Sequence, residues 1–312
     1  MLSRNGTNNI KAIAIILVMF GHLVTTKRIS VDFDLRMFAT FSVGAFLVLS
    51  GYGLTLSYIK NGLSGFIKKR LLTVVYPFIV INIIFYFYFF GKINTFDLLK
   101  TILFINPKLN IDPTMWYVYF ILIWYVIFFI IFSLKINIKI KIACLFFTSA
   151  LIYNIPVNSD FKAITTQFPL HSFSFSLGAF LALLKFDDKN KINFILLLSI
   201  VMFLFMYKNI ITPYLVKKQF LCSILFSLSL FLFFIIFEVK SKILAFISSI
   251  SYESYLIEGV TYKIKFHNNE VVNLFVYFLV TFFLAYIISI LIKKSIKSIK
   301  SIKSIKSIKS MN

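Results

Sequence analysis

Ten long apolar stretches divide this chain, and they constrain its fold more than any other feature. Most of them approach the roughly 20 residues that a helix needs to cross a bilayer. Single Ile- and Phe-rich segments would suit strands, but runs this long favour helices over the alternating pattern of a membrane β-barrel. We therefore predict an all-α integral membrane protein with about ten transmembrane helices in one bundle. The predicted helices are 9–26, 36–58, 71–91, 115–134, 142–156, 168–184, 192–207, 219–237, 243–262 and 271–292.

Composition agrees with a membrane protein and argues against nucleic-acid binding. Hydrophobic residues make up 60% of the 312 residues and charged residues only 14%, whereas a soluble domain is about 45–50% apolar. The net charge is +22, but the basic residues lie between apolar segments and in the tail. Cys144 and Cys222 both fall inside apolar segments. They therefore predict buried thiols, and their spacing suggests neither a disulfide framework nor a metal site.

The distribution of Lys and Arg between the connecting loops predicts the orientation in the membrane. If the N-terminus is inside, the inside segments carry 20 basic residues and the outside loops 12. Cytoplasmic loops carry the excess of Lys and Arg, so we expect both termini in the cytoplasm. The first apolar segment has no small-residue cleavage site after it. We expect it to remain as a helix and not to be removed as a signal peptide.

Two parts of the chain differ in character. Residues 1–294 form the predicted transmembrane domain, and residues 295–312 form a basic tail with five copies of Ser-Ile-Lys. A period of three does not match the 3.6 residues of a helical turn, so the tail presents no clean apolar face and is expected to be disordered. The alternative is a polybasic contact to anionic lipid, worth about 1 kcal/mol per Lys near the surface. A short apolar stretch at 96–105 is expected to lie along the interface.

Lys11 and His22 lie eleven residues apart in the first apolar stretch. A charged side chain at the bilayer centre costs about 3 kcal/mol on insertion scales, so such residues usually mark a site. Eleven helical steps of about 100° make about three turns, so the two side chains share one face, roughly 16 Å apart along the axis. The alternatives are a lysine that extends to the interface and a histidine hydrogen-bonded for structural reasons.

Three further segments carry motifs that are interpreted together with Lys11 and His22. The second stretch contains a run from Val43 that ends in Ser-Gly-Tyr at Tyr52, a basic cytoplasmic segment ends at Pro77, and a Ser-Tyr…Tyr-Leu-Ile-Glu segment ends at Glu258. In these four places the chain resembles the membrane-bound acyltransferase family 3, which acylates sugars of bacterial surface polysaccharides. The resemblance covers roughly residues 5–295, and it implies ten helices. The family usually has a His where this chain has Glu258, and it repeats a basic residue where this chain has Thr73 and Val74.

The resemblance implies an O-acyltransferase that uses acyl-CoA, expected to be acetyl-CoA, with no metal. His22 would be its catalytic centre, either as the general base that takes a proton from a sugar hydroxyl or as a transient acyl carrier. Lys11 would contact the cytoplasmic CoA. Lys69 and Arg70 would hold the CoA phosphates, with ordinary positive-inside charge as the alternative.

Other polar residues in the apolar stretches are weaker site candidates. Glu253 and Glu258 need partners at membrane depth. They point about 140° apart on a helix, so one could orient His22 or balance Lys11, and a structural ion pair is the alternative. His171, at the outer start of the sixth helix, could contact the acceptor. The default role of Trp116, at the outer start of the fourth, is interfacial anchoring, with stacking on a sugar ring as the alternative.

These features predict an enzyme that moves an acyl group to a hydroxyl of a cell-envelope sugar or polysaccharide. The expected location is the bacterial plasma membrane. Expected partners are acyl-CoA, a glycan acceptor, anionic lipid at the tail and proteins of envelope glycan synthesis. The alternative is a transporter or export factor for a polysaccharide or lipid-linked precursor. Such a transporter would usually contain two halves with corresponding interrupted helices, and the sequence shows no such repeat.

Overall fold

The computed structural model describes residues 1–27, 29, 33–91, 94–103, 112–156, 162–208 and 216–309. Regular structure in these ranges is helical, with no strand. The predicted all-α class is therefore confirmed. Long apolar segments adopt helices because a helix satisfies every internal backbone hydrogen bond within the segment.

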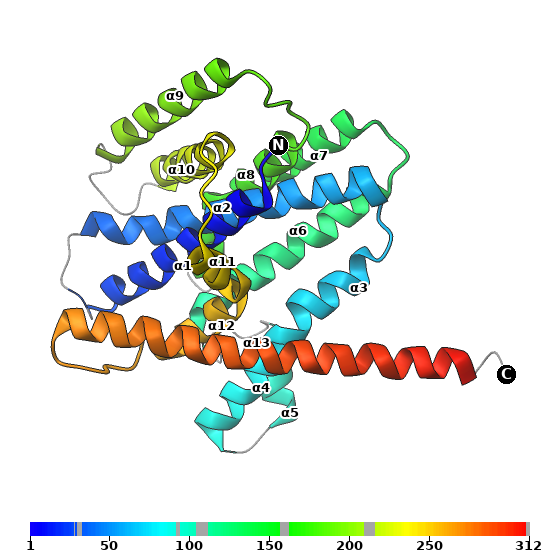
Figure 1. The fold of residues 1–312 in the computed structure, drawn as a ribbon, viewed down its shortest axis with the longest axis vertical. Helices are drawn as coiled ribbons and strands as arrows, with labels where there is room; N and C mark the ends of the chain where they lie inside the picture. The colour runs from blue at the N-terminus through cyan, green and yellow to red at the C-terminus, as the bar shows by residue number, and fades with distance from the viewer. Residues whose placement is uncertain are drawn as a thin grey trace. The chain divides into compact units, whose positions relative to one another are not determined.

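The chain forms two compact units, each made from two stretches of sequence. The first comprises Met1–Ser64 and Thr114–Ser249, and the second comprises Gly65–Pro113 and Ile250–Asn312. Figure 1 labels the helices. Those of the first unit are α1 (Arg4–Thr25), α2 (Phe33–Asn61), α6 (Trp116–Ser133), α7 (Ile138–Tyr153), α8 (Lys162–Leu181), α9 (Lys189–Lys208), α10 (Val216–Ile236) and α11 (Lys242–Ser249). Those of the second are α3 (Phe66–Arg70), the π-helix η1 (Leu71–Val75), α4 (Tyr76–Phe90), α5 (Thr95–Ile102), α12 (Ser251–Thr261) and α13 (Glu270–Lys309). A short 3-10 turn, η3 (Pro113–Met115), precedes α6.

Seven helical segments within the described ranges are long and apolar enough to cross a membrane. They are Arg4–Thr25, Arg36–Asn61, Phe66–Phe90, Trp116–Ser133, Lys189–Lys208, Gln219–Ile236 and Glu270–Ser298. The other three predicted spans correspond to α7, to α8 and to the pair α11 and α12. The chain is thus a multi-pass membrane protein, and the number of about ten crossings stays a prediction.

The predicted helix 243–262 is divided in two. Helix α11 ends at Ser249, Ile250 has φ −119° and ψ 7°, and α12 begins at Ser251. Serine side chains in this segment bond to the backbone: the Ser249 hydroxyl donates to the Phe246 carbonyl at 2.7 Å, and the Ser254 hydroxyl to the Ile250 carbonyl at 2.9 Å. Such local bonds compete with the helical ladder, and apolar periodicity does not reveal them.

Helix α2 is central to the first unit and packs against α1, α8 and α10. Its contact with α8 brings the two backbones together at glycines. A Cβ atom added at Gly178 would lie 2.0 Å from the Val48 carbonyl oxygen, and one at Gly51 would lie 2.0 Å from the Phe175 carbonyl oxygen. Small residues allow this approach in membrane helices, where tight packing replaces the hydrophobic effect as the driving force. Nothing lies within 4 Å of a Cβ atom added at Gly53.

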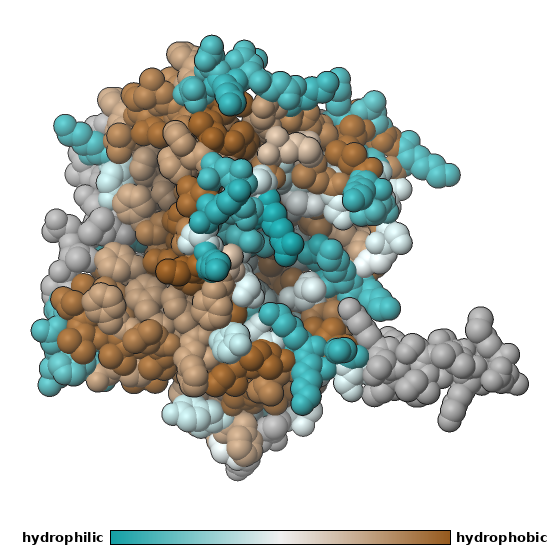
Figure 2. Space-filling model, viewed as in Figure 1, coloured by the Kyte–Doolittle hydropathy of each residue, from teal (hydrophilic) through white to brown (hydrophobic). Residues whose placement is uncertain are grey.

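The surface is rich in apolar side chains, as expected for contact with lipid. Figure 2 shows hydrophobic residues over much of the visible face, with hydrophilic residues grouped in separate patches. Helix α9 is an extreme case, since its large apolar side chains are mostly exposed. They include Phe194, Leu197, Val201, Leu204 and Phe205. A helix with this composition and exposure suits a lipid-facing position.

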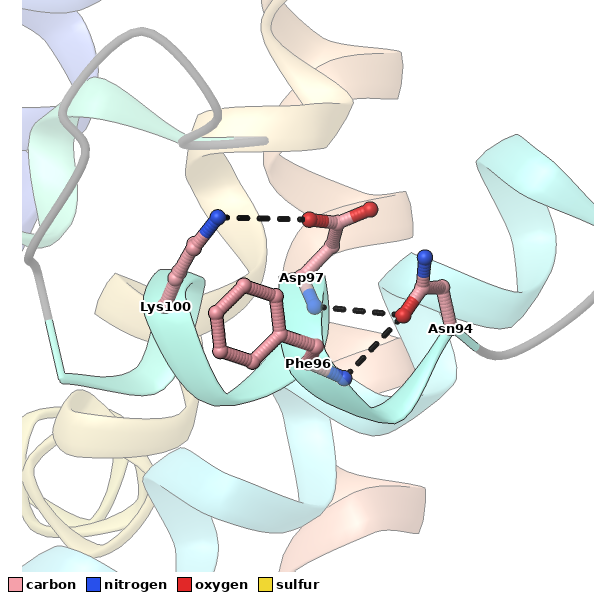
Figure 3. A network of polar contacts seen from close by, with 4 residues as sticks. All are labelled: Asn94, Phe96, Asp97 and Lys100. Carbon is pink, nitrogen blue, oxygen red and sulfur yellow. Dashed lines mark hydrogen bonds and ion pairs between the residues drawn. The ribbon is translucent and has the colours of Figure 1, made fainter.

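Helix α5 occupies the stretch expected along the interface. Its N-terminus is capped by Asn94, whose side-chain oxygen accepts hydrogen bonds from the backbone N–H groups of Phe96 at 3.1 Å and Asp97 at 3.5 Å (Figure 3). One turn later, the Lys100 ammonium lies 4.0 Å from the Asp97 carboxylate and 4.0 Å from the centre of the Phe96 ring. Capping and an i,i+3 ion pair stabilise a helix this short.

Helix α13 continues through the Ser-Ile-Lys repeats to Lys309, whereas the sequence predicts a disordered tail there. Its 40 residues contain no glycine or proline, and Lys, Ile and Ser are all tolerated in helices. The mismatch between a period of three and a helical turn removes a continuous apolar face, but it does not prevent the helix. Residues 310–312 of the predicted tail lie outside the described ranges.

Candidate functional site

The first part of the candidate site is helix α1, which holds both Lys11 and His22. The helix begins at a capped N-terminus, where the Ser3 hydroxyl accepts a hydrogen bond from the backbone N–H of Gly6 at 3.0 Å. It is unbroken to Thr25. Lys11 and His22 are both partly buried. A continuous helix places them about three turns apart on one side, as the spacing predicts.

The backbone beside His22 is fixed against α2. A Cβ atom at Gly21 would lie 2.3 Å from the Ala39 Cβ atom, so only glycine permits this approach. The carbonyl of His22 accepts two hydrogen bonds from Thr26, one from the backbone N–H at 3.0 Å and one from the hydroxyl at 2.9 Å. Both contacts hold the last turn of α1 in place.

The opposite end of α1, near Lys11, is held by the segment around α11. The Asn9 side chain donates to the Val239 carbonyl at 2.8 Å, and the Asn8 side chain accepts from the Ser248 hydroxyl at 3.2 Å. These bonds hold in place the turn of α1 that precedes Lys11. They cross between segments more than 200 residues apart in sequence, and composition alone does not predict them.

Helix α3 and the π-helix η1 in the second unit carry the predicted phosphate-binding residues. Lys69 is exposed, and Arg70 is partly buried with its guanidinium 5.7 Å from the centre of the Phe66 ring. The π-helix follows directly, and the carbonyl of Val74 within it accepts a hydrogen bond from the Tyr252 hydroxyl at 2.8 Å. The exposed cations suit contact with an anion, and the π turn joins them to α4.

Helix α12 carries the two predicted carboxylates, and both are buried. Glu253 is 8% exposed and Glu258 has no exposed surface. Glu258 accepts a hydrogen bond from the Tyr277 hydroxyl of α13 at 3.3 Å. Buried carboxylates at membrane depth are costly, so their presence marks a site or a structural polar pair.

A third buried carboxylate in this unit, Asp112, was missed by the sequence interpretation. It is 3% exposed, and its Oδ2 atom would lie 1.7 Å from a Cβ atom added at Gly259. Asp112 and Glu258 both interact electrostatically with the hydroxyls of Tyr262 and Tyr277. The signal that could have indicated Asp112 is its place in the sequence, shortly before a long apolar run.

The structure thus assigns the predicted residues to separate units. Lys11 and His22 belong to the first, while Lys69, Arg70 and the two glutamates belong to the second. The described ranges contain no group of three His, Cys, Asp or Glu side chains that could hold a metal ion.

Residues 4–293 match a family model described as an acyltransferase domain. The chain belongs to acyltransferase family 3. The match includes all six predicted site residues and most of both units. No curated protein and no solved structure gives a significant match.

Membership of acyltransferase family 3 confirms the resemblance based on the four motifs. It supports transfer of an acyl group by a membrane-embedded enzyme. The roles of the six site residues stay predictions.

A polar cluster in the first unit was not predicted as a cluster. His171 of α8 has no exposed surface, and its Nδ1 atom lies 3.3 Å from the Ser223 hydroxyl of α10. The hydroxyls of Ser223, Ser227 and Ser174 surround the position where Gly44 of α2 would carry a Cβ atom, at 2.5, 2.8 and 3.3 Å. The imidazole stacks on the Trp116 indole, with 5.7 Å between ring centres and 13° between planes.

Proposed function

We propose that this membrane acyltransferase moves an acetyl group from acetyl-CoA to a hydroxyl of a cell-envelope sugar or polysaccharide. The observation that carries the proposal is the partly buried His22, held on an unbroken apolar helix in a chain that matches an acyltransferase family over residues 4–293. Acyl transfer to a hydroxyl needs a group that removes the hydroxyl proton as the oxygen attacks, and histidine is the side chain most often used.

In this proposal His22 acts on the hydroxyl or carries the acyl group. As a base, it takes the proton while the oxygen attacks the thioester carbonyl, and the proton passes to the sulfur as the carbon–sulfur bond breaks. As a carrier, its nitrogen forms an acyl-imidazole that the hydroxyl then attacks. Both routes end in an ester and free CoA.

Cations on the chain supply the contacts for the donor. Lys11 lies about three turns from His22 on the same helix, a separation of about 16 Å along the axis. An extended pantetheine arm could run along that distance, from phosphates near Lys11 to a thioester near His22. Lys69 and Arg70 would bind further phosphate oxygens, with Arg70 offering a bidentate geometry.

The proposed setting is the bacterial plasma membrane with both termini in the cytoplasm, because the loops on that side carry more Lys and Arg. The donor then comes from the cytoplasm and the acceptor from the outer side. The lysines of the tail would contact anionic lipid, and proteins of envelope glycan synthesis would supply the acceptor.

A complementation experiment tests this function. A strain that lacks the gene receives the wild-type chain, His22→Ala or His267→Ala, and the O-acetyl content of its surface glycans is measured. The control removes an imidazole that is exposed in the loop before α13. We expect wild type and His267→Ala to restore acetylation and His22→Ala to fail while still accumulating in the membrane.

Two outcomes would contradict the proposal. Acetylation restored by His22→Ala would remove His22 from the chemistry. Unchanged acetylation in the deletion strain, together with loss of glycan from the surface, would instead indicate export.

A further inference from the structure

Two buried polar groups on α8 have no hydrogen-bond partner within the described ranges. They are the Nε2 atom of His171 and the hydroxyl of Ser174, which lie one helical turn apart. Both residues have no exposed surface. A buried polar group left without a partner costs about 1–3 kcal/mol. Two such groups on adjacent turns indicate a position where another molecule supplies the missing acceptor.

The surroundings of His171 determine which of its nitrogens carries the hydrogen. In the part of the chain that the structure describes, His171 Nδ1 is the acceptor within reach of the Ser223 hydroxyl, at 3.3 Å. We assign the Ser223 hydroxyl as the donor in this pair, so that Nδ1 accepts and Nε2 carries the hydrogen. Burial disfavours the charged imidazolium. His171 is therefore a neutral imidazole whose unused donor is Nε2–H.

The register of α8 against α2 gives the level of the His171 donor along the axis of α2. Gly44 faces Ser174, and Gly51 faces Ala179 further along both helices, so α2 and α8 run in the same direction. His171 precedes Ser174 by three residues, or about 4.5 Å of helix rise. It therefore lies level with the turn of α2 that precedes Gly44.

His22 lies near this level, somewhat further from Gly44. Its neighbour Gly21 packs against Ala39, five residues before Gly44, which corresponds to about 7.5 Å along α2. With His171 about 4.5 Å and Gly21 about 7.5 Å before Gly44, the two histidines are offset by about 3 Å along the axis of α2, on helices that both contact α2. An acyl group that reacts at His22 spans an offset of this size, so its carbonyl oxygen reaches the level at which His171 Nε2 lacks an acceptor.

We propose that the Nε2–H group of His171 donates a hydrogen bond to the carbonyl oxygen of the acyl group during transfer, with the Ser174 hydroxyl as a second donor. This inference rests on the proposed function. The acceptor oxygen attacks the thioester carbon, and His22 takes its proton. The carbonyl oxygen becomes negatively charged in the tetrahedral intermediate. The carbon–sulfur bond then breaks, and the proton passes from His22 to the sulfur.

In this scheme His171 keeps its own hydrogen throughout. A fixed neutral donor in a site without water stabilises the charge that develops on the oxygen. The stack on Trp116 and the bond from Ser223 hold the ring and its tautomer. Complete burial also protects the thioester from hydrolysis.

A matched pair of variants tests the proposal in full-length protein purified in detergent. The amide nitrogen of Gln reaches the position of histidine Nε2, whereas Asn reaches only the position of Nδ1. His171→Gln therefore keeps the donor to the acyl group and loses the partner of Ser223, and His171→Asn does the reverse. We expect acetyl transfer to fall at least about 100-fold in His171→Asn and less than about tenfold in His171→Gln. A purely structural role predicts the opposite order, and that order would overturn the proposal.

A second measurement does not depend on the folding of either variant. Acetyl-CoA labelled with 13C at the thioester carbonyl is bound to the wild-type protein, and its carbonyl band is recorded by infrared difference spectroscopy. A hydrogen bond from Nε2–H lowers the frequency of this band relative to free acetyl-CoA. A band at the free position in the wild type would overturn the proposal.

The acylation assay separates this inference from the proposed function. If the wild type does not acetylate, or if His22→Ala acetylates as the wild type does, the proposed function fails. If the wild type acetylates and needs His22, while His171→Asn equals the wild type, the function stands and the carbonyl site is wrong.

Discussion

The ammonium group of Lys141 donates a hydrogen bond of 2.6 Å to the hydroxyl of Tyr58, inside the first unit. It also donates to the carbonyl of Phe132, at 2.8 Å, and lies 4.6 Å from the centre of the Tyr58 ring. Lys141 is only 3% exposed. One cation thereby joins α7 to the last turn of α6 and to α2, and it satisfies a carbonyl at a helix C-terminus, where positive charge is favourable.

Replacing this cation should destabilise the protein. We expect Lys141→Ala to lower stability by about 2–4 kcal/mol, because it leaves a cavity and removes both hydrogen bonds. Lys141→Met should cost less, since it fills the volume of the side chain. The control is Lys139→Met, an exposed position on the same helix. Thermal unfolding of the purified protein in detergent measures the effect, and equal melting temperatures for all variants would contradict it.

The glycine contacts between α2 and α8 give a second prediction. Gly178→Ala places a methyl group against the Val48 carbonyl, so the helices must move apart at a cost of about 1–3 kcal/mol. Gly53→Ala is the matched control on α2, because it meets nothing within 4 Å. Alanine is there favoured over glycine in a helix by about 0.5–1 kcal/mol. Melting temperatures in detergent should fall for Gly178→Ala and stay level or rise for Gly53→Ala.

Glu258 gives a third prediction, which separates its charge from its hydrogen bond. Glu258→Gln keeps an oxygen that accepts from Tyr277 but removes the carboxylate, so we expect acetylation to fall at least about 100-fold if the carboxylate takes part in proton transfer. Tyr277→Phe keeps the carboxylate and should reduce acetylation less than about tenfold, as one hydrogen bond contributes about 1 kcal/mol. Surface O-acetyl content reports both. A larger loss in Tyr277→Phe would assign Glu258 a structural role.

Lys11 gives a fourth prediction, on donor binding. Lys11→Met should raise the KM for acetyl-CoA about 10- to 100-fold without a matching change for the acceptor, because it removes a charge-assisted contact to phosphate. Lys11→Arg should retain most of the donor affinity. Lys60→Met, at an exposed cation near the end of α2, is the control. An equal rise in both KM values would count against a donor contact.

The all-α fold class and the positions of the helices follow well from the apolar runs in the sequence. The predicted helix 115–134 is observed as Trp116–Ser133, and the predicted 192–207 as Lys189–Lys208, because helices in a bilayer must be long and apolar throughout. The break at Ile250 was missed because local serine bonds leave the hydropathy unchanged. The extension of α13 to Lys309 could not be predicted from the repeats, because periodicity reports amphipathic faces and does not report whether a helix forms.

The site was less predictable than the fold. His22 and Lys11 stood out because charge is rare at membrane depth, and their shared helix follows from spacing. The environment of His171 could not be predicted in this way, since it combines Trp116, Ser223 and Gly44 from three other helices. Asp112 is a single carboxylate with no motif around it, and its proximity to Gly259 arises only from tertiary packing.

The π-helix between α3 and α4 determines where the helical segment 66–90 can lose a residue. Its hydrogen bonds reach five residues back instead of four, so it accommodates one residue more than an α-helical turn. Deleting one residue from Leu71–Val75 would convert the turn to α-helix and leave the direction of Lys69 and Arg70 relative to α4 nearly unchanged, because the residue removed is the extra one that the π turn holds. The π turn is therefore the place where the span can lose one residue while the basic pair keeps its direction, whereas the same deletion within a regular α-helical stretch would rotate the residues on either side by about 100°.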